Sequence, residues 1–241
     1  MRTLVVGDIH SGLRALKEVL EKVNPAPGDR FIFLGDYVDG WSDAAPTVSF
    51  LIEFSKKYPC TFIRGNHDYL MYKYLKQDDE NPMWLAHGGQ ASKESYDVIT
   101  SEEKNQHITF YEDLQNYYID DRNRLFVHAG FTNLSGPRYE YFEDLVFWDR
   151  TLWETARSLD PDLTQDDIHY PQRLKLFNEI YIGHTPVTRI GATQPVNFAN
   201  LWNVDTGAAF KGPLTIMDAD SKEFWQSTPV HLLYPDENGR N

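Results

Sequence analysis

The chain has 241 residues, of which 41% are apolar, and a formal charge of −13 at pH 7. This length suffices for one well-filled α/β domain, so we expect residues 1–241 to form a single domain. So acidic a chain lacks the basic face that binds a phosphate backbone, which argues against a nucleic-acid partner.

Cys60 is the only cysteine, so no internal disulfide can form, and we expect it to be a small buried core residue. No apolar run approaches the roughly 18 residues of a membrane-spanning helix. The first residues lead directly into an apolar stretch and show no signal-peptide pattern. We therefore expect a cytoplasmic protein with no membrane partner, and the sequence leaves its oligomeric state open.

Three short apolar stretches near the start of the chain are predicted strands, and each ends in glycine followed by polar residues. They are Thr3–Val6 before Gly7-Asp8-Ile9-His10, residues 31–34 before Gly35-Asp36-Tyr37-Val38-Asp39, and residues 60–64 before Gly65-Asn66-His67-Asp68. Apolar residues recur at helical spacing between them, at Leu13–Val23 and at 48–55.

The spacing of the three turns predicts where they lie in the fold. Asp8 and Asp36 are 28 residues apart, and Asp36 and Asn66 are 30 apart, which matches strand–helix–strand units. Two such units bring the turns together at the carboxyl edge of a parallel sheet, where α/β folds bind ligands. The turns offer carboxylate, amide and imidazole groups without sulfur, a ligand set for divalent metals.

The rest of the chain continues the alternation of helices and strands. We predict helices at 69–75, 91–99 and 108–116, strands at 117–119, 124–127, 179–182 and 201–204, and a closing hairpin of 214–217 with 223–225. Three of these strands end in polar residues, namely His128, His184 and Asp205. We expect 154–177 to be an acidic surface insertion and 235–241 to be a frayed polar tail.

Five motifs at predicted strand ends carry a family resemblance. In order they are Gly-Asp-Ile-His at 7–10, Gly-Asp-Tyr-Val-Asp at 35–39, Gly-Asn-His-Asp at 65–68, His-Ala-Gly at 128–130 and Gly-His-Thr at 183–185. The series resembles the calcineurin-like metallophosphoesterases, and among them the PPP-type serine/threonine protein phosphatases. Trp84 with Gly88-Gly89, and Asn-Val-Asp-Thr-Gly at 203–207, resemble bacterial members. The resemblance covers Gly7 to about Gly207 and implies an α/β fold (α+β by some schemes), a four-layer αββα sandwich.

The resemblance implies a site with two divalent metal ions, manganese first, with iron or zinc as alternatives. The positions that match the family's metal ligands are Asp8, His10, Asp36, Asn66, His128 and His184, with Asp36 bridging the ions. His67 would be the general acid for the leaving group, and Asp39 would orient its ring. The implied reaction is hydrolysis of phosphoric monoesters, in phosphorylated proteins, peptides or small molecules, by in-line attack of a metal-bridging hydroxide.

Two positions depart from the family pattern. Ser11 stands where the first motif normally has glycine, and we expect it to cap the helix that follows. Gly40 stands where the second motif normally has an arginine that holds the substrate phosphate. Arg150 resembles a second phosphate-contacting arginine of bacterial members and is a candidate to bind the phosphate here. Arg64 is another candidate, with a structural role as its alternative. We therefore expect reduced activity or an altered choice of substrate.

Other interpretations of the same residues stay open. The same metals would serve symmetrical hydrolysis of dinucleoside tetraphosphates, and a non-catalytic metal-binding scaffold is the alternative of another class. Asp39 and Asp205 are also suited to hold turns, which we favour for Asp205. We assign no site role to the other histidines, although His87 is a candidate to line a cleft; they are His87, His107, His169 and His231. We expect three tryptophans in the core, namely Trp148, Trp153 and Trp202.

Overall fold

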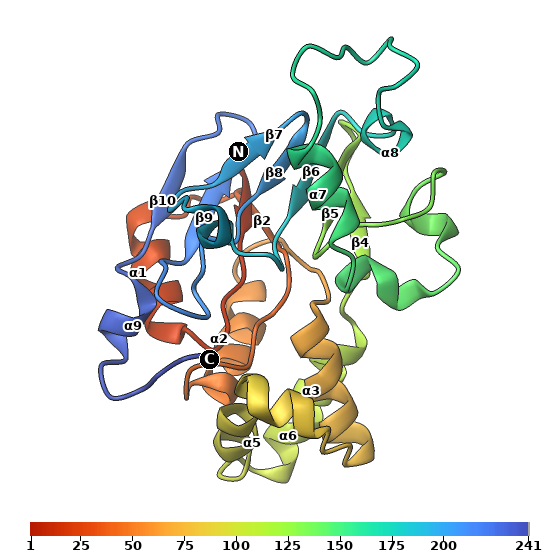
Figure 1. The fold of residues 1–241 in the computed structure, drawn as a ribbon. Helices are drawn as coiled ribbons and strands as arrows, with labels where there is room; N and C mark the ends of the chain where they lie inside the picture. The colour runs from red at the N-terminus through yellow and green to blue at the C-terminus, as the bar shows by residue number, and fades with distance from the viewer. Residues whose placement is uncertain (241) are drawn as a thin grey trace.

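The computed structural model describes residues 1–240 and contains two five-stranded sheets with helices on their outer sides (Figure 1). The first sheet, in the order β10-β9-β1-β2-β3, is formed by β1 (Thr3–Val6), β2 (Arg30–Phe33), β3 (Cys60–Phe62), β9 (Thr215–Asp218) and β10 (Phe224–Gln226). The second, in the order β4-β5-β6-β8-β7, is formed by β4 (Tyr117–Ile119), β5 (Arg124–Val127), β6 (Glu179–Ile182), β7 (Val196–Phe198) and β8 (Leu201–Asn203).

The helices lie between and after these strands. They are α1 (Leu13–Val23), α2 (Ala44–Ser55), α3 (Asn66–Gln77), α4 (Pro82–Trp84), α5 (Gln90–Tyr96), α6 (Ser101–Glu112), α7 (Thr151–Arg157), α8 (Gln172–Lys175) and α9 (Val230–Leu233). Shorter turns of other helix types are η1 (Leu85–Gly89), η2 (Pro137–Tyr139), η3 (Glu143–Phe147) and η4 (Val187–Ile190). None of the helices in residues 1–240 is both long and apolar enough to span a membrane.

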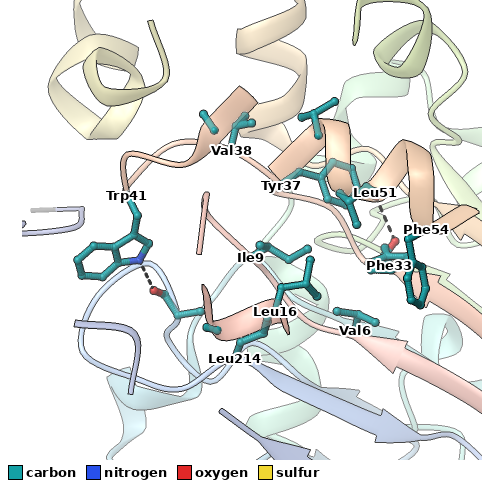
Figure 2. Packing of buried hydrophobic residues seen from close by; sticks show 14 of the residues in the cluster. Val6, Ile9, Leu16, Phe33, Tyr37, Val38, Trp41, Leu51, Phe54 and Leu214 are labelled. Atoms are coloured by element: carbon teal, nitrogen blue, oxygen red, sulfur yellow. Dashed lines mark hydrogen bonds between the residues drawn. The ribbon is translucent and has the colours of Figure 1, made fainter. Parts of the chain in front are cut away.

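Alternation of side chains along the strands builds four layers. In β1, Leu4 packs against the helices of the first sheet, whereas Val5 packs between the sheets. Figure 2 shows other residues of the cluster to which Leu4 belongs, among them Val6 and Leu16. In β5, Leu125 packs in the outer cluster of the second sheet and Phe126 packs between the sheets. Because successive strand residues point to opposite faces, each sheet buries both faces. This is the four-layer αββα sandwich that the resemblance implies.

Each sheet contains three parallel strands. β1, β2 and β3 are parallel in the first sheet, and β5, β6 and β8 are parallel in the second. The predicted strand–helix–strand units are therefore confirmed. The short turns that follow these six strands contain Asp8, Asp36, Asn66, His128, His184 and Asp205. The carboxyl edges of both sheets thus supply the polar groups.

Helix α3 begins at Asn66, earlier than the start predicted at residue 69. Gly65 is its N-cap, and the Asp68 carboxylate accepts a hydrogen bond from Gly65 N at 2.8 Å. Asn66 and His67 are therefore held by the first turn of a helix rather than by a loop, which fixes their direction more tightly.

The expected capping role of Ser11 is wrong. Helix α1 begins at Leu13 with Gly12 as its N-cap and has no side-chain cap hydrogen bond. The Ser11 hydroxyl is buried and has no hydrogen-bond partner within residues 1–240. Its backbone N–H instead donates to Tyr37 O at 2.8 Å, which joins the turn after β1 to the turn after β2.

Residues 154–177 are only partly a surface insertion. The ends of this region pack into the second outer cluster, through Ala156 and Leu174 for example. Only the loop between α7 and α8 extends away from the body of the protein, at the top of Figure 1. The region is therefore not an acidic loop that lies wholly over the surface, because the helices α7 and α8 at its ends carry apolar faces that pack against the protein.

The segment 235–240 is not frayed, contrary to the sequence expectation, while Asn241 lies outside the described residues. Glu237 accepts hydrogen bonds from Ser42 N at 2.8 Å and from Ser42 Oγ at 2.7 Å. Further along, Arg240 N donates to Ala209 O at 2.9 Å. These contacts fix the segment against residues that are far away in the sequence.

Cys60 is free and only half-buried, rather than the fully buried core residue expected. Burial nevertheless raises the pKa of its thiol to about 12. The reactive thiolate is therefore scarce near neutral pH, and a structural role for Cys60 fits better than a chemical one.

Candidate active site

Six of the predicted site residues converge where the carboxyl edges of the two sheets meet. Their candidate metal-binding atoms form two groups that share Asp36, and within each group these atoms lie within 4.8 Å of one another. The groups are Asp8, His10 and Asp36, and Asp36, His128 and His184. Asn66 joins the second group, because its Oδ1 lies 3.2 Å from His128 Nε2 and 2.9 Å from His184 Nδ1.

Backbone carbonyls orient two of the histidines. His10 Nδ1 lies 2.9 Å from Asp39 O, and His128 Nδ1 lies 2.8 Å from Leu34 O. A carbonyl only accepts, so each ring carries a hydrogen on Nδ1 and turns Nε2 toward Asp36, at 3.5 Å for His10 and 3.4 Å for His128. Metal-binding histidines use this arrangement, in which the second nitrogen donates to a backbone group.

Two buried carboxylates of this cluster, Asp8 and Asp205, lack a positive partner among residues 1–240. Burial and the neighbouring Asp205 raise the pKa of Asp8 well above its usual value, and burial raises that of Asp205 to about 6. Asp8 Oδ1 is buried without a hydrogen-bond partner in residues 1–240. Burial lowers the pKa of His128, but Asp36 outweighs this and raises it to about 10. Divalent cations would supply the missing positive charge, so the residues fit a metal site.

The backbone of the cluster is strained. His10, Asp36, Asp39 and His184 have φ values of 50°, 52°, 69° and 65°, a left-handed region that residues other than glycine seldom adopt. Such outliers gather at functional sites, where surrounding contacts hold them. Glycines stand beside these positions because of close approach. A Cβ at Gly183 would overlap the Asp8 carboxylate.

His67 and Asp39 are in contact, as expected. His67 Nδ1 lies 2.6 Å from Asp39 Oδ2, and Trp84 Nε1 donates to the same oxygen at 2.6 Å. Asp39 N also donates to Ser92 Oγ at 2.9 Å. Asp39 is thus also held by Trp84, at its carboxylate, and by Ser92, at its backbone. The sequence analysis connected neither residue with Asp39, although Trp84 lies in a stretch singled out by the resemblance.

A cavity of about 310 Å³ opens beside the cluster and is lined by His67, Asn66 and His184. Three arginines line the same cavity, namely Arg150, Arg189 and Arg240. Arg150 Nε lies 3.3 Å from His184 Nε2. Burial, then the two other arginines, lower the pKa of Arg150. Within residues 1–240, none of the three has a carboxylate within 4.0 Å, so the cavity wall is cationic in an acidic protein.

Two expected roles change. Arg64 does not line the cavity; its guanidinium donates to Tyr111 O at 3.2 Å and Leu114 O at 3.3 Å, a structural role next to α6. Trp148, expected in the core, is 39% exposed and lines the cavity. Trp153 is buried as expected.

Several residues of the site escaped the sequence analysis or were assigned to other roles there. Asp205 holds its turn through Gly207 N at 2.9 Å, as expected, but is also buried near Asp8. Arg189 and Arg240 carried no local motif, so no sequence signal identified them. His87 lines the cavity, whereas His107 is buried and hydrogen-bonded to Ser49, outside the site.

Comparison with known proteins adds independent findings. A family model described as calcineurin-like phosphoesterase matches residues 1–209. The asymmetrical bis(5'-nucleosyl)-tetraphosphatase PrpE of Bacillus subtilis is 25% identical over 226 residues, covering 88% of each chain. A provisionally named serine/threonine-protein phosphatase of Schizosaccharomyces pombe is 41% identical over 66 residues, which are 27% of this chain and only 22% of that protein. A solved structure provisionally named a diadenosine tetraphosphatase has a TM-score of 0.62 at 19% identity, covering 93% of this chain and 92% of the other.

Asp36→Asn should weaken the binding of both metal ions, because both ligand groups contain this carboxylate. We expect titration calorimetry with Mn²⁺ to give affinities at least about 10-fold lower at both sites. The matched control is Asp97→Asn, which changes an exposed carboxylate. Two Mn²⁺ ions bound to Asp36→Asn with wild-type affinity would contradict the shared-ligand assignment.

Asp68→Asn should destabilise the fold, because the Asp68 carboxylate accepts from Gly65 N at 2.8 Å, Asp36 N at 2.7 Å and Tyr37 N at 2.8 Å. The amide replaces one acceptor by a donor, so at least one buried N–H loses its partner. We expect the free energy of unfolding, measured in urea, to fall by about 1–3 kcal/mol. An unchanged value, as expected for Asp97→Asn, would show that these hydrogen bonds do not stabilise the turn.

Proposed function

The chain belongs to the calcineurin-like phosphoesterase family, and from this premise we propose that it is a metal-dependent hydrolase of phosphoric esters and anhydrides. The observation that carries the proposal is the pair of ligand groups that share Asp36 beside a cationic cavity. The mixed oxygen and imidazole donors suit manganese, iron or zinc better than calcium, and manganese is our first expectation. A cytoplasmic location stays a prediction.

The proposed ligands divide between two ions. One ion would lie among Asp8, His10 and Asp36, and the other among Asp36, Asn66, His128 and His184. When bound, the ions would supply Lewis-acid stabilisation of the phosphoryl charge and a more acidic water as the nucleophile.

The remaining chemistry comes from side chains of the cavity. Arg150, next to His184, is suited to bind phosphate oxygens through paired N–H groups. His67 lines the cavity and bonds to Asp39 through Nδ1, which leaves Nε2 to donate a proton to the leaving oxygen. The Asp39 carboxylate would stabilise the charged imidazole before transfer and fix its orientation.

The cavity favours a substrate with several phosphates. Its three arginines have no counter-ions in residues 1–240, and a single phosphomonoester does not need so much positive charge. Trp148 and Phe210 add flat apolar surface on which a base can stack. We propose a dinucleoside polyphosphate, a substrate class supported by the Bacillus subtilis relative that matches over 88% of both chains.

A phosphoserine or phosphothreonine peptide is the second candidate. It is supported by the local match of 41% identity to the Schizosaccharomyces pombe phosphatase, although the match spans only 66 residues. The sequence motifs favour this substrate, whereas the arginines of the cavity favour the dinucleotide. A non-catalytic scaffold is the least supported reading, since the ligand groups and the His67–Asp39 contact are all present.

A substrate panel distinguishes these candidates. With Mn²⁺ present, we expect kcat/KM for diadenosine tetraphosphate to exceed that for a phosphothreonine peptide by about tenfold or more, because extra phosphates meet extra arginines. Two molecules of ADP would indicate symmetrical cleavage, and AMP with ATP asymmetrical cleavage. A preference for the peptide would establish the second candidate, and no turnover of either by the metal-bound protein would favour the scaffold.

His67→Ala should slow substrates with poor leaving groups most. For an alkyl phosphate we expect a loss of about 10²–10⁴-fold in kcat, and a much smaller loss for p-nitrophenyl phosphate, whose phenolate leaves without a proton. The matched control is His87→Ala, since His87 also lines the cavity but bonds only to Met83 O at 2.7 Å. Equal losses on both substrates would remove the general-acid role.

A further inference from the structure

Arg240 reaches the cavity from outside the region that defines the family. The family model ends at residue 209, yet the Arg240 side chain lines the same cavity as His67 and Arg150. No motif in the sequence drew attention to it.

Two glycines make room for the Arg240 side chain. Gly40 and Gly88 have φ values of 128° and 105°, where side chains are disfavoured. A Cβ at Gly40 would lie 3.4 Å from Arg240 Cγ and 3.5 Å from His10 Cβ, and one at Gly88 would lie 3.0 Å from Arg240 Cγ. The arginine stem therefore passes over backbone that has no side chains, next to His10.

Arg150 and Arg240 line the same cavity beside the ligand cluster. Arg150 contacts His184, which belongs to one ligand group, whereas the stem of Arg240 passes Gly40 near His10, which belongs to the other. An anion bound in this cavity would therefore meet both guanidinium groups.

Among residues 1–240, the Arg240 guanidinium has no ion pair and no side-chain hydrogen bond. Its Nε is buried and has no hydrogen-bond partner among residues 1–240, and no carboxylate of that range lies within 4.0 Å. Its nearest described aromatic contact is Phe210, whose ring centre lies 5.6 Å from the Arg240 Cζ. A buried N–H without an acceptor is costly, and a phosphate oxygen is an acceptor that would satisfy it.

Specific contacts hold the end of this segment in place. The Arg240 N–H donates to Ala209 O at 2.9 Å, and Glu237 accepts two hydrogen bonds from Ser42, at 2.8 and 2.7 Å. Ser42 lies two residues before the start of α2, so these contacts hold the segment near the beginning of that helix.

The buried Trp41 supports the segment 235–240. Trp41 donates through Nε1 to Ala208 O at 2.8 Å, the dashed contact drawn at Trp41 in Figure 2. Tyr234 stacks on Trp41 with ring centres 5.2 Å apart, and the backbone of Gly239 lies against the same indole. Because Trp41 directly follows Gly40, the support of the segment and the room for Arg240 come from neighbouring residues.

We propose that Arg240 binds a phosphate group of the substrate in the same cavity as Arg150, and that residues 235–240 act as a latch holding it there. This rests on the proposed phosphoesterase function but not on which phosphoester is the substrate. A planar guanidinium can bind two phosphate oxygens at once, which a lysine cannot do. Arg240 is thus assigned as a substrate-binding residue.

The test is calorimetric binding of inorganic phosphate to the full chain supplied with Mn²⁺. We expect Arg240→Ala to weaken phosphate binding by about 10- to 100-fold and Arg240→Lys to recover part of the loss. Lys57→Ala is the matched control. Lys57→Ala removes one exposed positive charge. Lys57 lies before β3, whereas Asn66, which lines the cavity, comes after that strand. The phosphate affinity of this variant should stay within about twofold of wild type.

A second variant tests the latch separately. Glu237→Ala removes a negative charge, so charge alone would strengthen phosphate binding. The latch predicts weaker binding, because the loss of both Ser42 hydrogen bonds releases Arg240. Thermal melting by circular dichroism would verify that each variant keeps its fold.

The outcomes separate this inference from the choice of substrate. Phosphate affinity of folded Arg240→Ala within about twofold of wild type would overturn the role of Arg240, even if diadenosine tetraphosphate is cleaved. Unchanged or tighter binding by Glu237→Ala would overturn the latch. If Arg240→Ala weakens phosphate binding while only the peptide is hydrolysed, the inference stands and the dinucleotide proposal fails.

Discussion

The Asp36 carboxylate is the group on which the rest of the site depends. Its Oδ1 accepts from His67 N at 2.9 Å, and its Oδ2 lies 3.5 Å from His10 Nε2 and 3.4 Å from His128 Nε2. One buried charge therefore orients a helix start and imidazoles from both sheets. A buried carboxylate is stable only when positive groups or metals surround it. The fold and the proposed metal centre therefore both require positive charge next to Asp36.

Much of this arrangement follows from local sequence. A strand followed by glycine and a polar residue can be recognised from the local sequence alone. The repeat of about 30 residues between such strands predicts that neighbouring strands are parallel. This was enough to predict a parallel sheet with Asp8, Asp36 and Asn66 together at one edge. The four-layer sandwich, and the place of His128 and His184 in the same site, followed from the family resemblance. These residues could be found because each lies in the turn that follows a strand, and neighbouring parallel strands have their carboxyl ends at the same edge of the sheet.

What the sequence did not predict depends on contacts between distant segments. The expected roles of Ser11 and Arg64 were plausible locally, but tertiary packing gave Ser11 a buried hydroxyl and turned Arg64 toward α6. The segment 235–240 looked like a tail because its contacts are not local: Ser42, which donates to Glu237, lies 195 residues earlier. Gly40 stands where the family pattern has an arginine, and the side chain of Arg240 lies beside it. Arg240 is thus the structural counterpart of that missing arginine.

The central claim is that two metal ions share the Asp36 carboxylate between the carboxyl edges of the two sheets. The most direct test is an anomalous difference map from crystals of the wild-type protein grown with Mn²⁺. The account predicts two peaks about 4 Å apart, one on each side of Asp36. A single peak, or two peaks with neither in contact with Asp36, would contradict it.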